Sequence, residues 1–235
     1  KTALSAYGHI LSRGIIAIKL EEGDELIGVA LTSGRDEIIL GTKLGMAVRF
    51  NEDPDKGGVR AMGRNAAGVR GITLGEGDEV VSLIVVPVEN NDSEEPADDN
   101  GDDNADEGEI TDVGQAMVLV ATANGYGKRT PVKQYRLTRR GGKGVKNIKM
   151  NERNGPVIGM VVTHGGEDLM LITEKGILIR TRSDEVSAYG RAAAGVKLIR
   201  LDEGDRLVAM AKLDPEESKS ENNTDSAESD KPSDA

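Results

Sequence analysis

A short motif recurs four times along the chain and limits the fold more than any other feature of the sequence. Each copy has a glycine, a β-branched residue, two variable residues and an isoleucine, as in Gly14–Ile18, Gly68–Ile72, Gly144–Ile148 and Gly195–Ile199. We call these four glycines the anchor glycines. They lie 54, 76 and 51 positions apart, and the long interval becomes 52 without the 24 acidic-rich residues 89–112. A fixed period of this size is typical of repeat architectures, so the chain is predicted to fold as similar units of about 52 residues.

Each unit carries the pattern of short strands joined by tight turns. In three units an apolar run is followed by Thr-x-x-Gly and a second run, with the first runs at 38–40, 117–120 and 169–172. Further turns are indicated by Asn154-Gly155 and by three Glu-Gly-Asp sequences, because Asn-Gly and glycine suit tight hairpins. No stretch shows a convincing apolar period of 3.6 residues. We therefore expect an all-β protein of propeller-like, four-stranded blades, with three nearly complete units and a partial one at the C-terminus.

The charge is distributed unevenly. The chain carries a net charge of −11, yet residues 89–112 hold 12 acidic and no basic residues, and residues 214–235 hold 8 acidic and 2 basic ones. The remaining body has 28 basic against 21 acidic residues, a balance of +7, which is typical of a polyanion binder. Aromatic residues make up only 2% of the chain, so duplex is favoured over single-stranded nucleic acid.

The two acidic segments are expected to be disordered, because they contain almost no apolar residues to bury. One hypothesis is that they act as intramolecular mimics of DNA that lower the affinity of the basic body. The alternative is that they serve only solubility.

A basic, glycine-containing loop precedes three of the anchor glycines. The loops 62–68, 138–144 and 189–195 align without gaps and place an arginine third in each: Arg64, Arg140 and Arg191. Arginine pairs well with phosphate oxygens, and glycine lets a backbone approach a surface closely. Three such loops in register favour DNA contact over ordinary solvated turns. The first unit needs a one-residue gap and has His9 at this place.

The segment Arg139–Gly144 closely resembles the core of the gyrase A box, a signature of the C-terminal domain of the DNA gyrase A protein. Segments 125–130 and 59–64 also resemble that domain, and the resemblance covers residues 1–213. It implies a β-pinwheel, usually of six blades, that wraps duplex DNA in a positive sense and so supports ATP-driven negative supercoiling by the whole topoisomerase. Thr138 replaces the glutamine that begins the family's box, and this copy lies in the third unit, so it is interpreted as an internal copy. The start at Lys1-Thr2 is interpreted as the end of an earlier unit. We thus expect about four of six blades in residues 1–213, interrupted by the insertion 89–112 and followed by the tail 214–235.

The predicted DNA contacts combine the basic loops with basic residues near the anchors. They are Arg64, Arg70, Lys128, Arg129, Arg139, Arg140, Gly141, Gly142, Lys143, Gly144, Lys146, Arg191 and Lys197.

No catalytic or metal-binding constellation emerges from the sequence. The acidic run 98–104 lacks the glycine and glutamate positions of a calcium loop, and the two histidines, His9 and His164, are far apart. The resemblance implies a non-catalytic domain without a cofactor of its own, with ATP and magnesium used by other parts of the enzyme. It implies duplex DNA, the rest of the gyrase A protein and the gyrase B protein as partners, no membrane, a monomeric state and a cytoplasmic, nucleoid-associated location. Two alternatives stay open: the C-terminal domain of the A-type protein of topoisomerase IV, and a propeller-like scaffold that binds proteins.

Overall fold

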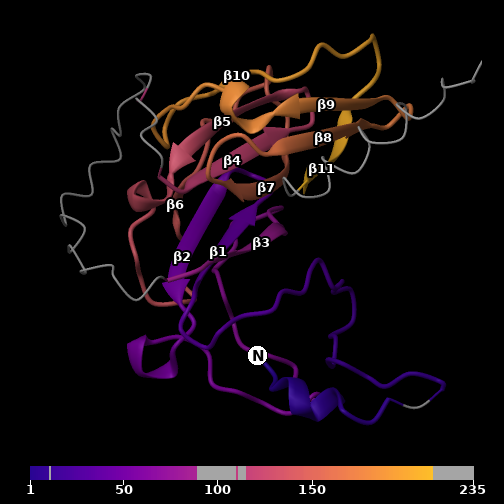
Figure 1. Ribbon diagram of the computed structural model, residues 1–235, viewed down its shortest axis with the longest axis vertical. Coiled ribbons are helices and arrows are strands. Elements are labelled where there is room, and N and C mark those ends of the chain that lie inside the picture. Colours follow the sequence, from indigo (N-terminus) through magenta and orange to yellow (C-terminus); the bar gives the residue numbers. More distant parts are fainter. Residues whose placement is uncertain (11, 89–109, 111–114, 214–235) are drawn as a thin grey trace, which may run out of the picture.

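The structure, a computed structural model, describes residues 1–10, 12–88, 110 and 115–213. The expectations for the acidic insertion and the acidic tail therefore lie outside the described residues, apart from Ile110. The described part contains three antiparallel sheets and four short 3-10 turns (Figure 1), η1 Leu4–Tyr7, η2 Pro54–Lys56, η3 Val132–Gln134 and η4 Ser183–Glu185. The expected all-β class is confirmed.

Two of the sheets have four strands and the third has three. The first has the order β3 (Val80–Val86), β1 (Glu37–Thr42), β2 (Met46–Asn51), β6 (Val145–Lys146). The second has the order β10 (Val196–Lys197), β5 (Tyr126–Pro131), β4 (Met117–Thr122), β7 (Val157–Thr163). The third has the order β11 (Leu207–Leu213), β8 (Asp168–Thr173), β9 (Leu178–Arg182).

The outer strands β6 and β10 are supplied by a later repeat than the hairpins to which they pair. After the β4–β5 hairpin the chain returns to the first sheet, where β6 pairs with β2, and then supplies β7 to its own sheet. The same step after β8–β9 places β10 beside β5. The sequence pattern predicted four strands per unit but did not reveal this exchange. Among the described residues no strand covers the free edge of β9.

The three predicted Thr-x-x-Gly hairpins are confirmed as β1–β2, β4–β5 and β8–β9. The glycine of each turn has a positive φ between 77° and 85°, a conformation that residues with a side chain rarely adopt. These glycines are Gly45, Gly125 and Gly176. In two of them the threonine hydroxyl accepts a hydrogen bond from the backbone four residues on, at 3.1 Å from Met46 N and 3.2 Å from Ile177 N. Local sequence therefore determines where each hairpin reverses.

The core is aliphatic and is centred on the second sheet. Every residue of β4 is buried, and the strand β7 beside it contacts both β3 of the first sheet and β11 of the third. Buried Ile39, Val118, Val120 and Val157 belong to one apolar cluster that spans the first two sheets. The second sheet therefore lies between the other two (Figure 1), and burial of aliphatic surface joins them. Residues 1–10 and 12–36, by contrast, form η1 and no strand.

Candidate nucleic-acid interface

The loops around successive anchor glycines are joined by one repeated backbone hydrogen bond. In each case the N–H five residues after an anchor glycine donates to the carbonyl two residues before the next anchor. The bonds are Lys19 N to Ala66 O at 3.4 Å, Thr73 N to Gly142 O at 2.8 Å, and Lys149 N to Ala193 O at 3.1 Å. The basic loops of neighbouring repeats therefore lie side by side in a continuous series, which we call the loop row.

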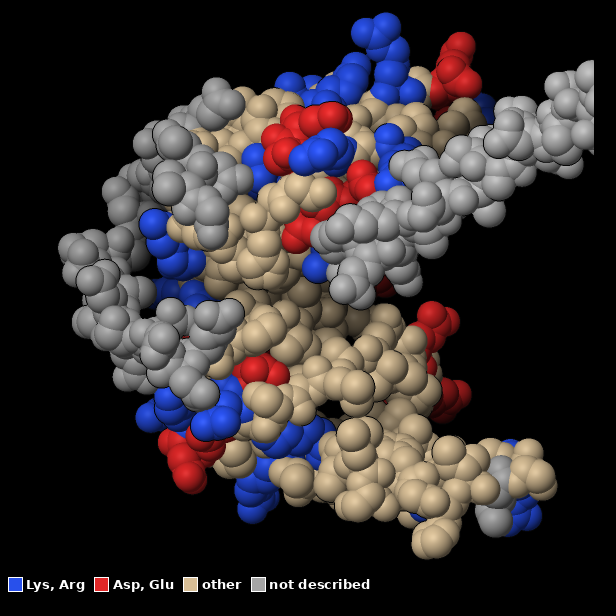
Figure 2. Space-filling model, in the orientation of Figure 1, with Lys and Arg blue, Asp and Glu red and all other residues tan. Residues whose placement is uncertain are grey.

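Exposed basic side chains repeat at fixed positions along the loop row. Two residues after the anchor they are Arg70, Lys146 and Lys197, and five residues after it they are Lys19, Lys149 and Arg200. All six are exposed, and Figure 2 shows groups of Lys and Arg side chains along the left margin and the top of one face. A series of cations at a regular interval suits a polymer whose phosphates also recur regularly.

The third loop adds the greatest local concentration of positive charge. Arg139 and Lys143 are exposed, and Gly142 between them is exposed as well. Gly141 is half-buried and donates its N–H to Gly71 O at 2.6 Å, so its backbone is used within the loop row. The predicted contacts Arg139, Gly142 and Lys143 thus lie on the surface, where a phosphate can reach them.

Two of the four anchor glycines are required for close packing. Gly144 has φ 78°, and a Cβ at this place would lie 2.3 Å from Ala47 O of β2. Gly195 has the same φ, and its Cβ would lie 2.4 Å from Gly127 O of β5. Gly144 and Gly195 therefore let the short strands that follow them, β6 and β10, approach the hairpins of earlier repeats, whereas Gly14 and Gly68 have no neighbouring atom within 4 Å of such a Cβ. The expected DNA contact by Gly144 therefore has a packing explanation in this structure.

Lys128 and Arg129 were predicted as DNA contacts, but the structure buries both. Lys128 is 0% exposed, and its Nζ donates to the carbonyls of Gly190 and, at 2.8 Å, of Arg191. Burial, and secondarily the charge of Arg191, lowers the pKa of Lys128 from 10.5 to about 7. Arg129 is 4% exposed and its Nε donates to Val186 O at 2.5 Å. Both side chains are engaged by backbone of the next repeat, so their prediction as surface contacts is wrong.

Arg64, Arg140 and Arg191 are half-buried and bind backbone across the loop row. Each Nη1 donates to a carbonyl of the preceding repeat: Ile16 O at 2.7 Å, Arg70 O at 3.1 Å and Lys146 O at 3.1 Å. These three predicted DNA contacts are therefore committed in part to the protein itself.

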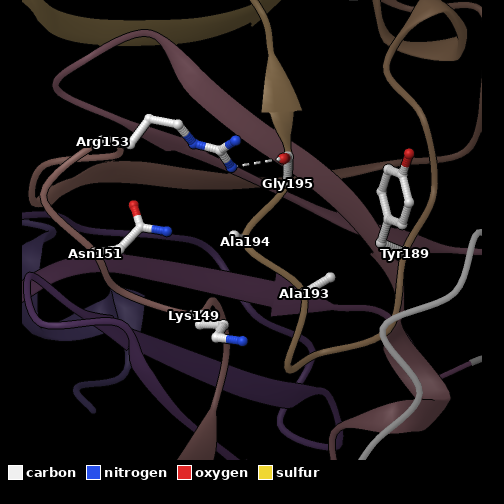
Figure 3. A pocket seen from close by; sticks show the side chains of 7 residues that line it. All are labelled: Lys149, Asn151, Arg153, Tyr189, Ala193, Ala194 and Gly195. Carbon is white, nitrogen blue, oxygen red and sulfur yellow. Dashed lines mark hydrogen bonds between the residues drawn. The ribbon is translucent and has the colours of Figure 1, made fainter.

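A shallow pocket of about 400 Å³ opens in the loop row between the third and fourth anchors (Figure 3). Its lining residues come from two segments, Lys149, Asn151 and Arg153 on one side and Tyr189 with Ala193–Gly195 on the other. Arg153 donates to Gly195 O at 3.4 Å and lies over the ring of Tyr126, 4.7 Å from its centroid. The pocket is open and its charged residues are all basic, which suits an anionic group.

Sequence reasoning missed four exposed basic residues of this surface: Lys19, Lys149, Arg153 and Arg200. Three of them occupy the fifth position after an anchor glycine, so the repeat register already contained the signal. Arg153 lies in the turn before β7 and has no counterpart by register.

The described residues contain neither a metal-binding cluster nor a membrane-spanning helix. No group of three or more His, Cys, Asp or Glu side chains there could hold a metal ion. None of the helices in the described part of the chain is long and apolar enough to cross a membrane.

Three successive sheets, strand exchange between repeats and a series of loops along one side define a β-pinwheel, a propeller-like repeat domain. The family model described as "DNA gyrase C-terminal domain, beta-propeller" matches residues 10–33, 36–87, 116–164 and 167–214. The chain therefore belongs to the family of DNA gyrase C-terminal domains.

Similar proteins agree with this family. The DNA gyrase A protein of Staphylococcus aureus (strain NCTC 8325 / PS 47) is 43% identical over 225 residues, 96% of this chain and 22% of that protein. The DNA gyrase A protein of Staphylococcus epidermidis (strain ATCC 12228 / FDA PCI 1200) is 41% identical over 217 residues, 92% of this chain and 21% of its own length. The chain thus spans about a fifth of the length of these relatives.

Solved structures show the same fold. A structure of a DNA gyrase A C-terminal domain superposes with a TM-score of 0.67 at 26% identity, covering 85% of this chain and 58% of that one. The C-terminal domain of a DNA topoisomerase IV superposes with a TM-score of 0.74 at 24% identity, covering 92% and 58%. The second likeness establishes the fold alone.

Proposed function

We propose that this domain binds duplex DNA along the loop row and wraps it, as a non-catalytic part of a DNA gyrase A protein. The observation that carries the proposal is the recurrence of exposed cations at two positions of the repeat, each of which is basic in three of the four repeats. Hydrogen bonds between the loops fix these cations in one series, so a duplex that contacts one loop is directed toward the next.

The chemistry of the surface supports binding without sequence preference. The body of the chain carries +7, and its candidate contacts are Lys and Arg side chains suited to phosphate. Neutralised phosphates release counterions, so affinity depends steeply on salt. A propeller-like scaffold for proteins needs no such dependence, and this difference separates the two functions.

Binding is tested by titrating labelled duplexes of unrelated sequence with the 235-residue chain at several salt concentrations. If about five phosphates are engaged, log affinity falls with log salt at a slope of about −4 to −5, equally for each sequence. A slope near zero, or no binding at low salt, contradicts the proposal.

Wrapping is tested separately on closed circular DNA that is relaxed by a nicking-closing enzyme while the chain is bound. A positive wrap leaves positively supercoiled circles after the protein is removed. An unchanged linking number would leave DNA binding intact and contradict wrapping.

The relatives imply the wider assembly. We propose that the domain acts within a cytoplasmic, nucleoid-associated type II topoisomerase together with the rest of the gyrase A protein and with the gyrase B protein. In this proposal ATP and magnesium serve other parts of that enzyme, the domain has no cofactor of its own, and the isolated domain is a monomer. The whole enzyme then introduces negative supercoils by combining this wrap with ATP-driven strand passage. The relatives named gyrase favour this over a part of topoisomerase IV.

A further inference from the structure

One side-chain hydrogen bond recurs at the same register in three successive loops. The arginine four residues before an anchor glycine donates its Nη1 to the carbonyl two residues after the preceding anchor. Arg64 thus binds Ile16 O, Arg140 binds Arg70 O, and Arg191 binds Lys146 O, at 2.7, 3.1 and 3.1 Å. A bond repeated at one register across three repeats is a feature of the architecture.

The surroundings show that these arginines lie where the loops of consecutive repeats meet, a contact that we call the joint between repeats. Arg140 also donates its Nε to Gly58 O at 3.0 Å, while Thr73 Oγ1 donates to Gly141 O at 2.7 Å beside it. Buried Lys128 also contacts the loop of Arg191, because its Nζ donates a hydrogen bond to the Arg191 carbonyl. All three arginines are half-buried, whereas Arg139 next to Arg140 is exposed.

The carbonyls that two of the arginines hold belong to candidate DNA contacts. Arg140 binds the backbone of Arg70, and Arg191 binds the backbone of Lys146, while the side chains of Arg70 and Lys146 are exposed. The planar fork of arginine can bind two acceptors in a fixed geometry, which the flexible ammonium of lysine does not reproduce.

We propose that Arg64, Arg140 and Arg191 are positioning residues that join consecutive repeats and fix the spacing of their DNA contacts. In this role Arg140 acts on DNA through Arg70, and Arg191 acts on DNA through Lys146. The inference deepens the proposed function, because it states how one phosphate-binding loop is placed relative to the next. It predicts that a charge-conserving change to lysine is as harmful as loss of the charge.

The joint itself is tested without DNA, by amide hydrogen exchange of the full chain. In Arg140→Lys the amides of Gly141 and Thr73, which bond across the joint, should exchange at least about fivefold faster. In the control Arg139→Lys, one residue away, both rates should stay as in the unchanged chain. Arg191→Lys should give the same acceleration at Lys149, whose amide bonds to Ala193. Unchanged exchange in Arg140→Lys and Arg191→Lys overturns the proposal.

The effect on DNA is tested with two duplexes, one too short to reach from one loop to the next and one that spans the row from Arg70 to Lys197. Arg140→Lys should leave the short duplex unaffected and weaken the long one about tenfold, while Arg139→Gln should weaken both. Equal weakening of both duplexes by Arg140→Gln, with full rescue by Arg140→Lys, identifies a direct phosphate contact and overturns the proposal. If the unchanged chain binds neither duplex, the proposed function fails, and amide exchange alone then decides whether the arginines join the repeats.

Discussion

The strands β5 and β9 occupy the same position in consecutive sheets but have opposite surroundings. All but the first residue of β5 are buried, whereas β9 alternates between exposed and half-buried residues. The cause is the next repeat, which places β10 and the segment 183–189 against β5, whereas no strand pairs with the outer edge of β9 among the described residues. The surroundings of a strand in this fold are therefore determined by the repeat that follows it.

The arginine four residues after the hairpin glycine shows the consequence. Arg49 in β2 donates to Tyr135 O at 3.1 Å, and Arg129 in β5 donates to Val186 O at 2.5 Å. Both carbonyls lie nine residues before the next anchor glycine, so this bond is also repeated. Arg180 in β9 pairs with Asp168 of the neighbouring strand, as Arg49 also does with Glu37, and its side chain remains 43% exposed. One residue type at one register is thus half-buried in the first sheet, buried in the second and exposed in the third.

The largest expected effect contrasts Arg129 with Arg180. Arg129→Gln removes a buried charge and leaves backbone carbonyls without their donor, so it should lower the free energy of unfolding by about 3 kcal/mol. Arg180→Gln removes an exposed ion pair and should cost less than about 1 kcal/mol. Urea denaturation of both variants measures the difference, and equal losses would break the comparison.

The second contrast concerns the residue two positions after the hairpin glycine. Gly127 in β5 has no room for a side chain, because a Cβ would lie 2.2 Å from Val120 O and 2.5 Å from Leu198. Leu178 at the same place in β9 is 56% exposed. Gly127→Ala should therefore cost about 2 kcal/mol, and Leu178→Ala less than about 1 kcal/mol, in the same unfolding assay. Gly127→Ala without a loss would show that Val120 and Leu198 do not pack as closely on this glycine as the structure places them.

The third contrast is a pH effect confined to β5. Because the pKa of Lys128 is lowered to about 7, the unfolded chain binds more protons than the native one between this value and the ordinary 10.5. The free energy of unfolding should therefore rise with pH across that window, by up to about 1.4 kcal/mol per pH unit. Below that window this lysine should contribute no pH dependence.

Lys128→Val introduces a residue like those at the same register in the other hairpins, Val48 and Ile179. The difference in unfolding free energy between the two proteins should change from about pH 7 upward, as the unchanged chain gains stability that the variant does not. A difference that is constant from about pH 6 to about pH 9 would mean that Lys128 is not held in a desolvated site.

Much of the fold could be predicted because it follows from local sequence. The Thr-x-x-Gly hairpins and their aliphatic strands are readable over a few residues, and all three hairpins are present in the structure. The family was also identified correctly, since the segment 139–144 is specific to it.

Other features could not be predicted because they depend on contacts between repeats. The exchange of β6 and β10 joins strands that lie far apart in the sequence, and no local pattern marks it. Lys128 and Arg129 look like surface charges in the sequence, yet carbonyls of the next repeat surround them. For Arg180 the same pattern does give a surface residue, so local sequence alone cannot separate the two cases.

The central claim is that duplex DNA follows the exposed cations of the loop row. The most direct test is the salt dependence of duplex binding by a chain in which Arg70, Lys146 and Lys197 are all changed to Gln. The control changes Lys133, Lys175 and Arg206, three exposed basic residues at other positions, in the same way. The slope of log affinity against log salt should become shallower by about 2.5 to 3 in the first variant and by less than about 1 in the control. Equal slopes for the two variants would contradict the central claim.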